Sequence, residues 1–156
     1  HMSAPQYQRH MAPLLEQAAG ERFTTVAMMR DPVDWVGSWY RFRQRDDLSR
    51  PEISTRDISF EGAVEGYLST PPARNMDVGS QAQFLCAGGD GPLVDRLFRY
   101  EAIGEFVDFL EDRLGCEIIL PRLNVSPAAA LDLSAPLRDR LNAHLAADHA
   151  IYRRLA

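Results

Sequence analysis

The pattern of apolar and polar residues divides the chain into helices and short apolar strands. Apolar residues recur at three- and four-residue steps over residues 5–19, which predicts an amphipathic helix that ends at Gly20. The segment FTTVAMM, residues 23–29, is short, apolar and bounded by charge, as is typical of a buried strand. Asp31 is a suitable N-cap and Pro32 a suitable first helical residue, so the next helix should begin there.

The rest of the chain continues this alternation. Helical spacing predicts helices over residues 60–68, 80–85, 103–114 and 134–152, whereas residues 93–100 fit a strand. Residues 41–57 are dense in charge, and we expect a helix tail followed by a surface loop. Strands that alternate with helices indicate one α/β domain with a largely parallel sheet.

Composition limits the classes of function. Hydrophobic residues make up 46% of the 156 residues, enough for a core, and the net charge of −5 argues against broad binding to nucleic acid or to an acidic membrane. The chain has no apolar run of the ~18 residues that a membrane span needs and no signal-peptide pattern, so we expect a cytoplasmic protein. Cys86 and Cys116 lack zinc-ligand spacing, so we expect no metal site.

The basic residues are unusual because all 17 are arginine. A P-loop of the form GxxxxGK[ST] needs its lysine to reach the transferred phosphoryl group. This chain contains no lysine and therefore no such loop. A bound anion would have to be held by arginine and by backbone amides.

The segment RDPVDWVGSWY, residues 30–40, is the strongest candidate for an anion site. If Arg30 ends a buried strand and a helix begins at Pro32, the first-turn amides lie near the carboxyl edge of the sheet, where open α/β sheets bind ligands. Arg30 would add a guanidinium fork suited to a phosphate dianion, and Ser38 a hydroxyl group. Spacing alone equally allows a structural alternative, in which Arg30 pairs with a nearby aspartate and Ser38 is a small packed residue.

These residues resemble the 3′-phosphate-binding motif of the sulfotransferases: an arginine at a strand end, Asp-Pro, a helix, and a serine eight positions after the arginine with an aromatic residue beside it. Phe98–Gly115 is similar to the strand and helix that follow in that family, LPRLNVSP (residues 120–127) to its loop before the final helices, and Leu145–Leu155 to its closing helix. The resemblance covers nearly the whole chain. It is closest to small bacterial sulfotransferase-like proteins, some of which carry a gamma-glutamyl kinase label.

The resemblance implies an α/β fold of the P-loop-like sulfotransferase type, with three layers around a mostly parallel sheet and much helix. It implies 3′-phosphoadenosine-5′-phosphosulfate as the co-substrate, held by Arg30, Ser38, Arg122 and Asn124. The family's first strand and its PKTGTT-like loop, which holds the 5′-phosphosulfate, have no counterpart here. We therefore expect residues 1–156 to be a single, N-terminally truncated domain that carries the 3′-phosphate-binding half and is inactive alone.

The implied reaction is sulfuryl transfer to a hydroxyl or amine of a small-molecule or carbohydrate acceptor. No general base can be assigned, since a histidine such as His10 on a polar helix face is more often solvated. The four-residue spacing of Trp35 and Trp39 favours core packing over stacking on adenine. Two alternatives remain open: an ATP-dependent, gamma-glutamyl kinase-like phosphotransferase, and a non-catalytic interaction module that forms a homodimer through an exposed sheet edge.

Overall fold

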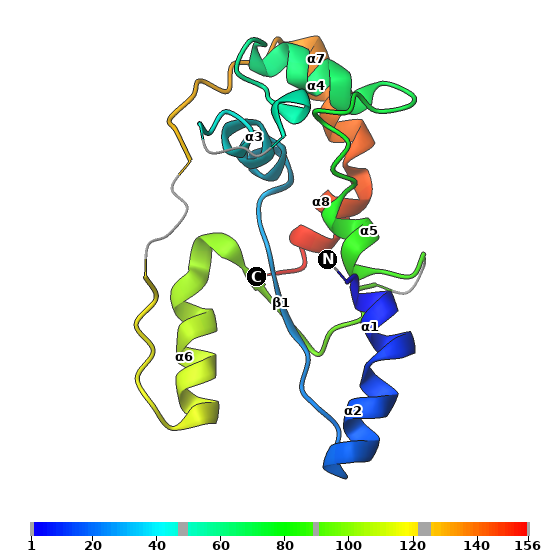
Figure 1. Cartoon of the computed structure of the whole chain (residues 1–156), viewed down its shortest axis with the longest axis vertical. Coiled ribbons are helices and arrows are strands. Elements are labelled where there is room, and N and C mark those ends of the chain that lie inside the picture. Colours follow the sequence, from blue (N-terminus) through cyan, green and yellow to red (C-terminus); the bar gives the residue numbers. More distant parts are fainter. Residues whose placement is uncertain (1, 47–49, 89–90, 122–125, 156) are drawn as a thin grey trace. The chain divides into compact units, whose positions relative to one another are not determined.

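The computed structural model describes residues 2–46, 50–88, 91–121 and 126–155 (Figure 1). Its elements follow in the order α1 (Ala4–His10), α2 (Ala12–Ala19), β1 (Val26–Met29), α3 (Pro32–Phe42), a 3₁₀ turn (Pro51–Ile53), α4 (Phe60–Leu68), α5 (Gln81–Leu85), β2 (Arg96–Arg99), a second 3₁₀ turn (Tyr100–Ala102), α6 (Ile103–Leu114), α7 (Ala135–His144) and α8 (Ala146–Tyr152). The described residues are rich in helix and contain a two-stranded parallel sheet, in agreement with the α/β class. Among their helices, none has both the length and the apolar character needed to cross a membrane.

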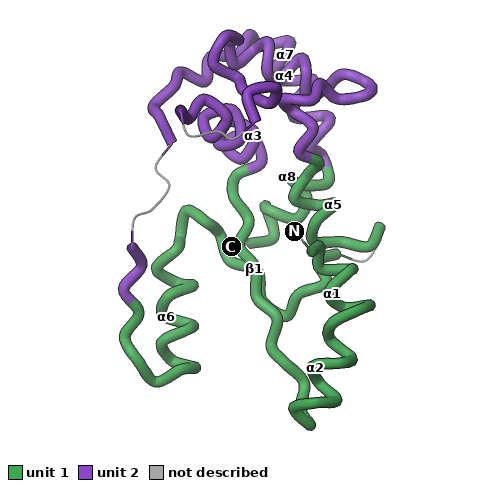
Figure 2. Tube along the Cα trace, in the orientation of Figure 1, with its two compact units in different colours: residues 1–31, 79–118, 147–156 green, residues 32–78, 119–146 purple. Residues whose placement is uncertain are grey.

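The chain divides into two compact units, which we call unit 1 and unit 2 (Figure 2). Unit 1 comprises residues 1–31, 79–118 and 147–156, and unit 2 comprises residues 32–78 and 119–146. Each unit has its own cluster of buried apolar side chains. The assignment of residues 1–156 to a single domain stays a prediction.

The sheet belongs to unit 1. Strands β1 and β2 run parallel, with Val26 opposite Arg96 and Met29 opposite Arg99. Strand β1 is shorter than the apolar run over residues 23–29. Just before the strand, the backbone N–H and the hydroxyl group of Thr25 both donate to the Asp95 carboxylate at 2.8 Å, and the Thr25 carbonyl oxygen accepts the backbone N–H groups of Asp95 and Arg96 at 3.0 and 3.1 Å.

The core of unit 1 packs beneath this sheet. It consists of the buried side chains Met29, Ala82, Leu85 and Ile151, which come from β1, α5 and α8. Burying one such large apolar side chain contributes about 1.5–3 kcal/mol. These contacts fix α5 and α8 relative to the end of β1.

The N-terminal segment forms two helices instead of the single helix that its periodicity predicted. Ser3 caps α1 with a capping box, in which its hydroxyl group and the Gln6 side chain each accept a backbone N–H. The break falls at Met11, just before Pro13 in the first turn of α2, since proline has no N–H to continue the ladder of an existing helix. Gly20 ends α2 in the left-handed conformation, at φ 75°.

Unit 2 is a helical cluster built on α3, α4 and α7. Its core consists of Val36, Tyr40, Phe60, Ala63, Val64, Tyr67, Met76, Leu137, Leu141 and Leu145. Helix α4 spans the predicted residues, and the Ser59 hydroxyl group accepts the Gly62 N–H as its N-cap. A Cβ at Gly37 would lie 2.6 Å from a methyl group of Leu131, so any other residue here would force the Leu131 side chain to shift.

The predicted C-terminal helix is also divided in two. Helix α7 ends at His144, and Leu145 follows as its C-cap with φ −88° and ψ 18°. Leu145 is fully buried in the core of unit 2, whereas residues 147–156 belong to unit 1. The apolar stripe therefore serves two cores, and the helix breaks where the chain passes from one unit to the other.

Candidate functional site

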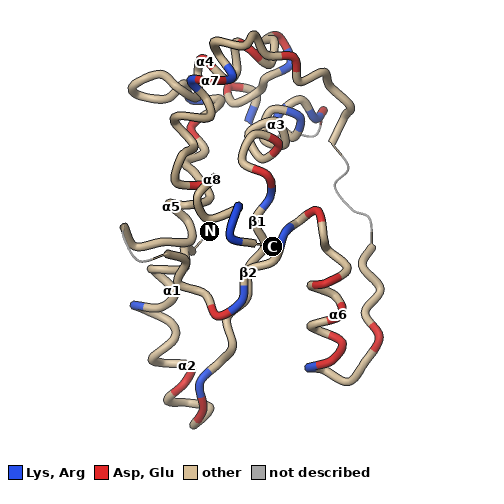
Figure 3. The backbone as a smooth tube through the Cα atoms, turned by 180° about the vertical axis from the view of Figure 1, so that it is seen from behind, with Lys and Arg blue, Asp and Glu red and all other residues tan. Residues whose placement is uncertain are grey.

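The carboxyl ends of β1 and β2 bring together the polar residues that follow each strand. Arg30 and Asp31 follow β1, and Tyr100 and Glu101 follow β2, whose last residue Arg99 lies opposite Met29. Figure 3 labels both strands and marks the charged positions along the trace. Because parallel strands end at the same edge, this cluster occupies the place where open α/β sheets bind ligands.

The backbone of Arg30 is fixed by one side chain. Its N–H donates to Oε1 of Gln81 at 2.9 Å, and its carbonyl oxygen accepts a hydrogen bond from Nε2 of the same glutamine, also at 2.9 Å. Gln81 is the first residue of α5, after the N-cap Ser80, and is only 8% exposed. The two hydrogen bonds satisfy both polar groups of a residue just beyond the strand and so set the direction of its side chain.

The guanidinium group of Arg30 lies over the Tyr100 ring, 3.8 Å from the ring centroid. A cation over an aromatic face contributes about 0.5–2 kcal/mol, depending on how far it is removed from water. Arg30 is half-buried in this position. A planar guanidinium group binds an oxyanion through its edge.

Glu101 links three elements of the site. Its carboxylate accepts the Asp31 N–H at 2.9 Å and the Tyr152 hydroxyl group of α8 at 2.8 Å. Partial burial raises the pKa of Glu101, but these hydrogen bonds and the charge of Arg30 outweigh burial and lower its pKa overall. Burial and the hydrogen bond to Glu101 raise the pKa of Tyr152 to about 12. At neutral pH, Glu101 is therefore ionised and Tyr152 is a neutral donor.

Arg99 is a site residue that the sequence reasoning missed. Its guanidinium group lies over the Tyr152 ring, 4.8 Å from the centroid. Its Nε is buried and has no hydrogen-bond partner in the described part of the chain. The signal was present in the sequence, since Arg99 lies at the end of a short strand and Arg30 directly after one. The edge thus carries two arginines beside the carboxylates of Asp31 and Glu101.

Ser38 lies on α3, in unit 2. It lines a cavity of about 310 Å³ together with Trp35, Trp39, Phe42 and Ser126. Trp35 packs against the core of unit 2, as its spacing predicted, and meets Trp39 edge to face with ring centroids 6.2 Å apart. Because Arg30 belongs to unit 1 and Ser38 to unit 2, their joint binding of one anion stays a prediction.

The other candidate residues have no assigned place in this cluster. Arg122 and Asn124 lie outside the described residues, so their assignment as ligands of the nucleotide stays a prediction. His10 ends α1 and is exposed. In the ranges that the structure describes, no three side chains of His, Cys, Asp or Glu gather as a metal site would require.

The charge along α6 contrasts with that of the sheet edge (Figure 3). Four of the twelve residues of α6 are acidic and one, Arg113, is basic. An anion would be repelled by this helix, and the arginines that end β1 and β2 offer the better place for it.

Comparisons of the chain with protein-family models, with curated proteins and with solved structures find no match. The interpretation of the site therefore depends on its geometry and on the sequence motif.

Proposed function

We propose that the chain is the 3′-phosphate-binding half of a sulfotransferase-like protein that uses 3′-phosphoadenosine-5′-phosphosulfate. The finer fold assignment, a P-loop-like sulfotransferase architecture of three layers, is part of the same proposal. The proposal rests on the motif RDPVDWVGSWY and on where its first residue lies in the structure.

The observation that carries the proposal is the fixed position of Arg30 at the carboxyl end of a parallel strand. Gln81 holds both backbone polar groups of Arg30, and Tyr100 supports its guanidinium group. Helix α3 begins two residues later in the sequence, at Pro32, and belongs to unit 2. An arginine fork suits a phosphate dianion.

In the proposed reaction, the acceptor oxygen or nitrogen attacks the sulfur of the donor in line with the bridging oxygen. The bond between sulfur and the bridging oxygen breaks, and 3′-phosphoadenosine-5′-phosphate leaves. The acceptor proton passes to a general base that no residue of this chain is assigned to supply. In this proposal, the described residues hold the donor by its 3′-phosphate. Holding the reactants in the geometry of the reaction lowers the activation barrier.

The acceptor in this proposal is a small molecule or a carbohydrate with a free hydroxyl or amine. The loops over residues 46–57 and 71–79 would determine which one, since specificity resides in loops carried by a rigid scaffold. We propose no nucleic-acid or membrane partner. A homodimer formed through the sheet edge belongs to the interaction-module alternative.

Thermal unfolding followed by circular dichroism tests the proposal. A ligand that binds only the folded state stabilises it by about 2.7 kcal/mol at a hundred times its Kd. We expect 3′-phosphoadenosine-5′-phosphate to raise the Tm and ATP to raise it much less, and we expect Arg30→Ala to remove this difference. Arg9→Ala is the matched control, because Arg9 is an exposed arginine of unit 1 on α1.

Three outcomes would count against the proposal. Equal stabilisation by both nucleotides would indicate a general anion site. ATP turnover that depends on magnesium would favour the phosphotransferase. A stable dimer whose Tm ignores all adenosine nucleotides would favour the interaction module.

A further inference from the structure

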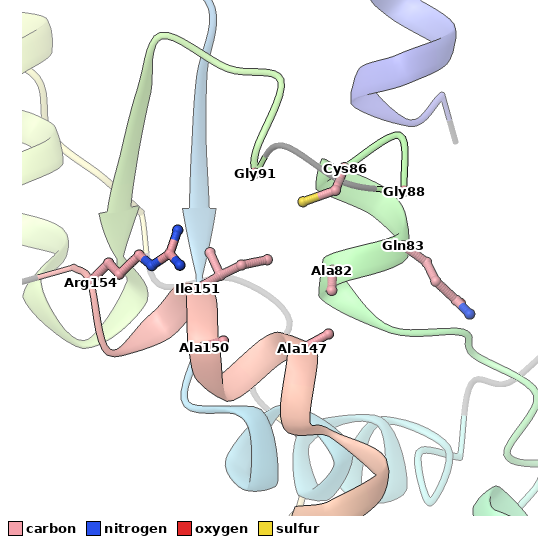
Figure 4. Close-up of a pocket in the computed structure, with 9 residues that line it drawn as sticks. All are labelled: Ala82, Gln83, Cys86, Gly88, Gly91, Ala147, Ala150, Ile151 and Arg154. Carbon is pink, nitrogen blue, oxygen red and sulfur yellow. The ribbon is translucent and has the colours of Figure 1, made fainter.

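A second cavity lies within unit 1, between α5 and α8, and has a volume of about 710 Å³ (Figure 4). This volume falls in the range of sites that hold small organic ligands, about 300–1,000 Å³. None of the residues that line it belongs to the cluster around Arg30. The cavity is therefore separate from the proposed donor site, and a ligand bound in it would be independent of sulfuryl transfer.

The walls of the cavity are mostly apolar and made of small residues. Three alanines, two glycines, Ile151 and Cys86 line it, and Figure 4 shows the Cys86 sulfur directed into the space between the two helices. Small side chains on both helices leave room for the hydrocarbon part of a ligand.

The end of the cavity near Cys86 disfavours a negative charge. Asp148 is 2% exposed, and its carboxylate accepts the N–H of Ala82 at 3.1 Å. Burial and this neighbouring carboxylate raise the pKa of the Cys86 thiol, which therefore stays neutral and forms part of the apolar wall. An anionic group would be placed best at the opposite end.

Arg154 supplies the positive charge at that opposite end. Among the described residues that line the cavity it is the one charged side chain, it is exposed, and its guanidinium group has no ion pair with any of the described residues. The second polar residue, Gln83, points away from the space in Figure 4. The cavity thus combines one cation with an otherwise apolar surface.

We propose that this cavity binds a small free carboxylate with a hydrocarbon body. The carboxylate pairs with Arg154, and the hydrocarbon lies along Ile151 and the alanines of α5 and α8. Charge complementarity determines this choice. A neutral ligand would form no ion pair with Arg154, and a cationic ligand would be repelled by it.

Protection of Cys86 from a maleimide tests the proposal. The full chain with Cys116→Ser is used, so that Cys86 is the one remaining thiol. Decanoate is the probe and 1-decanol is the neutral control. We expect decanoate to slow the modification of Cys86 in a saturable way and decanol to do so only at higher concentration.

Three variants locate the binding. Arg154→Gln should weaken protection by decanoate about threefold, as expected for the loss of an ion pair at an exposed arginine. Protection by decanol should stay unchanged in this variant. Arg153→Gln removes the neighbouring arginine, which does not line the cavity. This variant should change neither the protection by decanoate nor the protection by decanol. Ala147→Phe, at an exposed position of α8, places a bulky side chain in the cavity and should abolish protection while the circular dichroism spectrum is kept.

The proposal is overturned if decanoate gives no saturable protection. It is also overturned if decanol protects Cys86 as well as decanoate does, or if Arg154→Gln and Arg153→Gln weaken the protection by decanoate equally. Protection that survives Ala147→Phe would place the ligand elsewhere and would likewise overturn it.

Discussion

Replacing Gln81 by alanine perturbs the element that fixes Arg30 most directly. The side chain joins the first turn of α5 to the end of β1, across 51 residues of sequence, through two hydrogen bonds of 2.9 Å. In Gln81→Ala, the N–H and the carbonyl oxygen of Arg30 both lose their partner, and the 8% exposure of Gln81 shows how little water reaches this position.

The expected cost comes from these two groups. Leaving a buried donor or acceptor unsatisfied costs about 1–3 kcal/mol, and water entering the vacated space recovers part of this. We therefore expect Gln81→Ala to lower the free energy of unfolding of unit 1 by about 2–4 kcal/mol. The matched control is Gln83→Ala on the same helix. Gln83 is exposed and its Oε1 accepts the Ser80 N–H at 3.1 Å, so its loss should cost about 0.5–1 kcal/mol.

Hydrogen exchange followed by mass spectrometry measures this effect in unit 1. Both tryptophans, Trp35 and Trp39, belong to unit 2, so their fluorescence does not report on unit 1. Amides of β1 and β2 should exchange about 30- to 700-fold faster in Gln81→Ala, since 1.4 kcal/mol corresponds to a factor of ten. The reasoning is refuted if Gln81→Ala and Gln83→Ala accelerate exchange equally.

Three further predictions concern stability. Leu141→Ala, at a fully buried position of unit 2, should lower the free energy of unfolding by about 2–5 kcal/mol in urea titrations followed by tryptophan fluorescence; a cost under about 1 kcal/mol would contradict the assigned core. Hydrogen bonds from Thr25 and Arg22 lower the pKa of Asp95 to about 2, so the wild-type free energy of unfolding should fall as the pH drops through 3.8 toward 2, and Asp95→Asn should lose that part of the pH dependence; an unchanged acid profile in the variant would disprove it. The raised pKa of Tyr152 has the opposite sign, because stabilisation of the neutral phenol is present below pH 10 and is lost as the pH rises to about 12; the ultraviolet titration should lose its latest tyrosine transition in Tyr152→Phe, and retention of that transition would contradict the assignment.

Local signals in the sequence were enough for most of the helices. Helical spacing predicted α4 over its observed residues, Phe60–Leu68, and predicted α5 over residues 80–85, one residue before its observed start at Gln81. Long periodic segments were less well predicted, because periodicity does not show where a helix breaks. The break at Met11 depends on a proline, and the break at Leu145 depends on a second core.

Only the part of the site that lies within one continuous segment of the chain was predicted from the sequence. The strand end at Arg30 and the helix start at Pro32 follow from residues 23–40, and the structure has both. Gln81 contacts Arg30, Glu101 contacts Asp31, and Tyr152 contacts Glu101, through hydrogen bonds between residues 51 to 70 positions apart. No periodicity or spacing encodes such contacts, which arise from the packing of α5 and α8 against the sheet.

A thermodynamic cycle at Arg30 tests the central claim most directly. Calorimetric titrations would give the Kd of 3′-phosphoadenosine-5′-phosphate and of adenosine-5′-phosphate, which differ by the 3′-phosphate alone, for the wild-type chain and for Arg30→Ala. A charge-assisted hydrogen bond contributes about 1.5–3 kcal/mol, so the 3′-phosphate should tighten wild-type binding by roughly ten- to a hundredfold and that of Arg30→Ala by less than about twofold. The same ratio of affinities in both proteins would contradict the account.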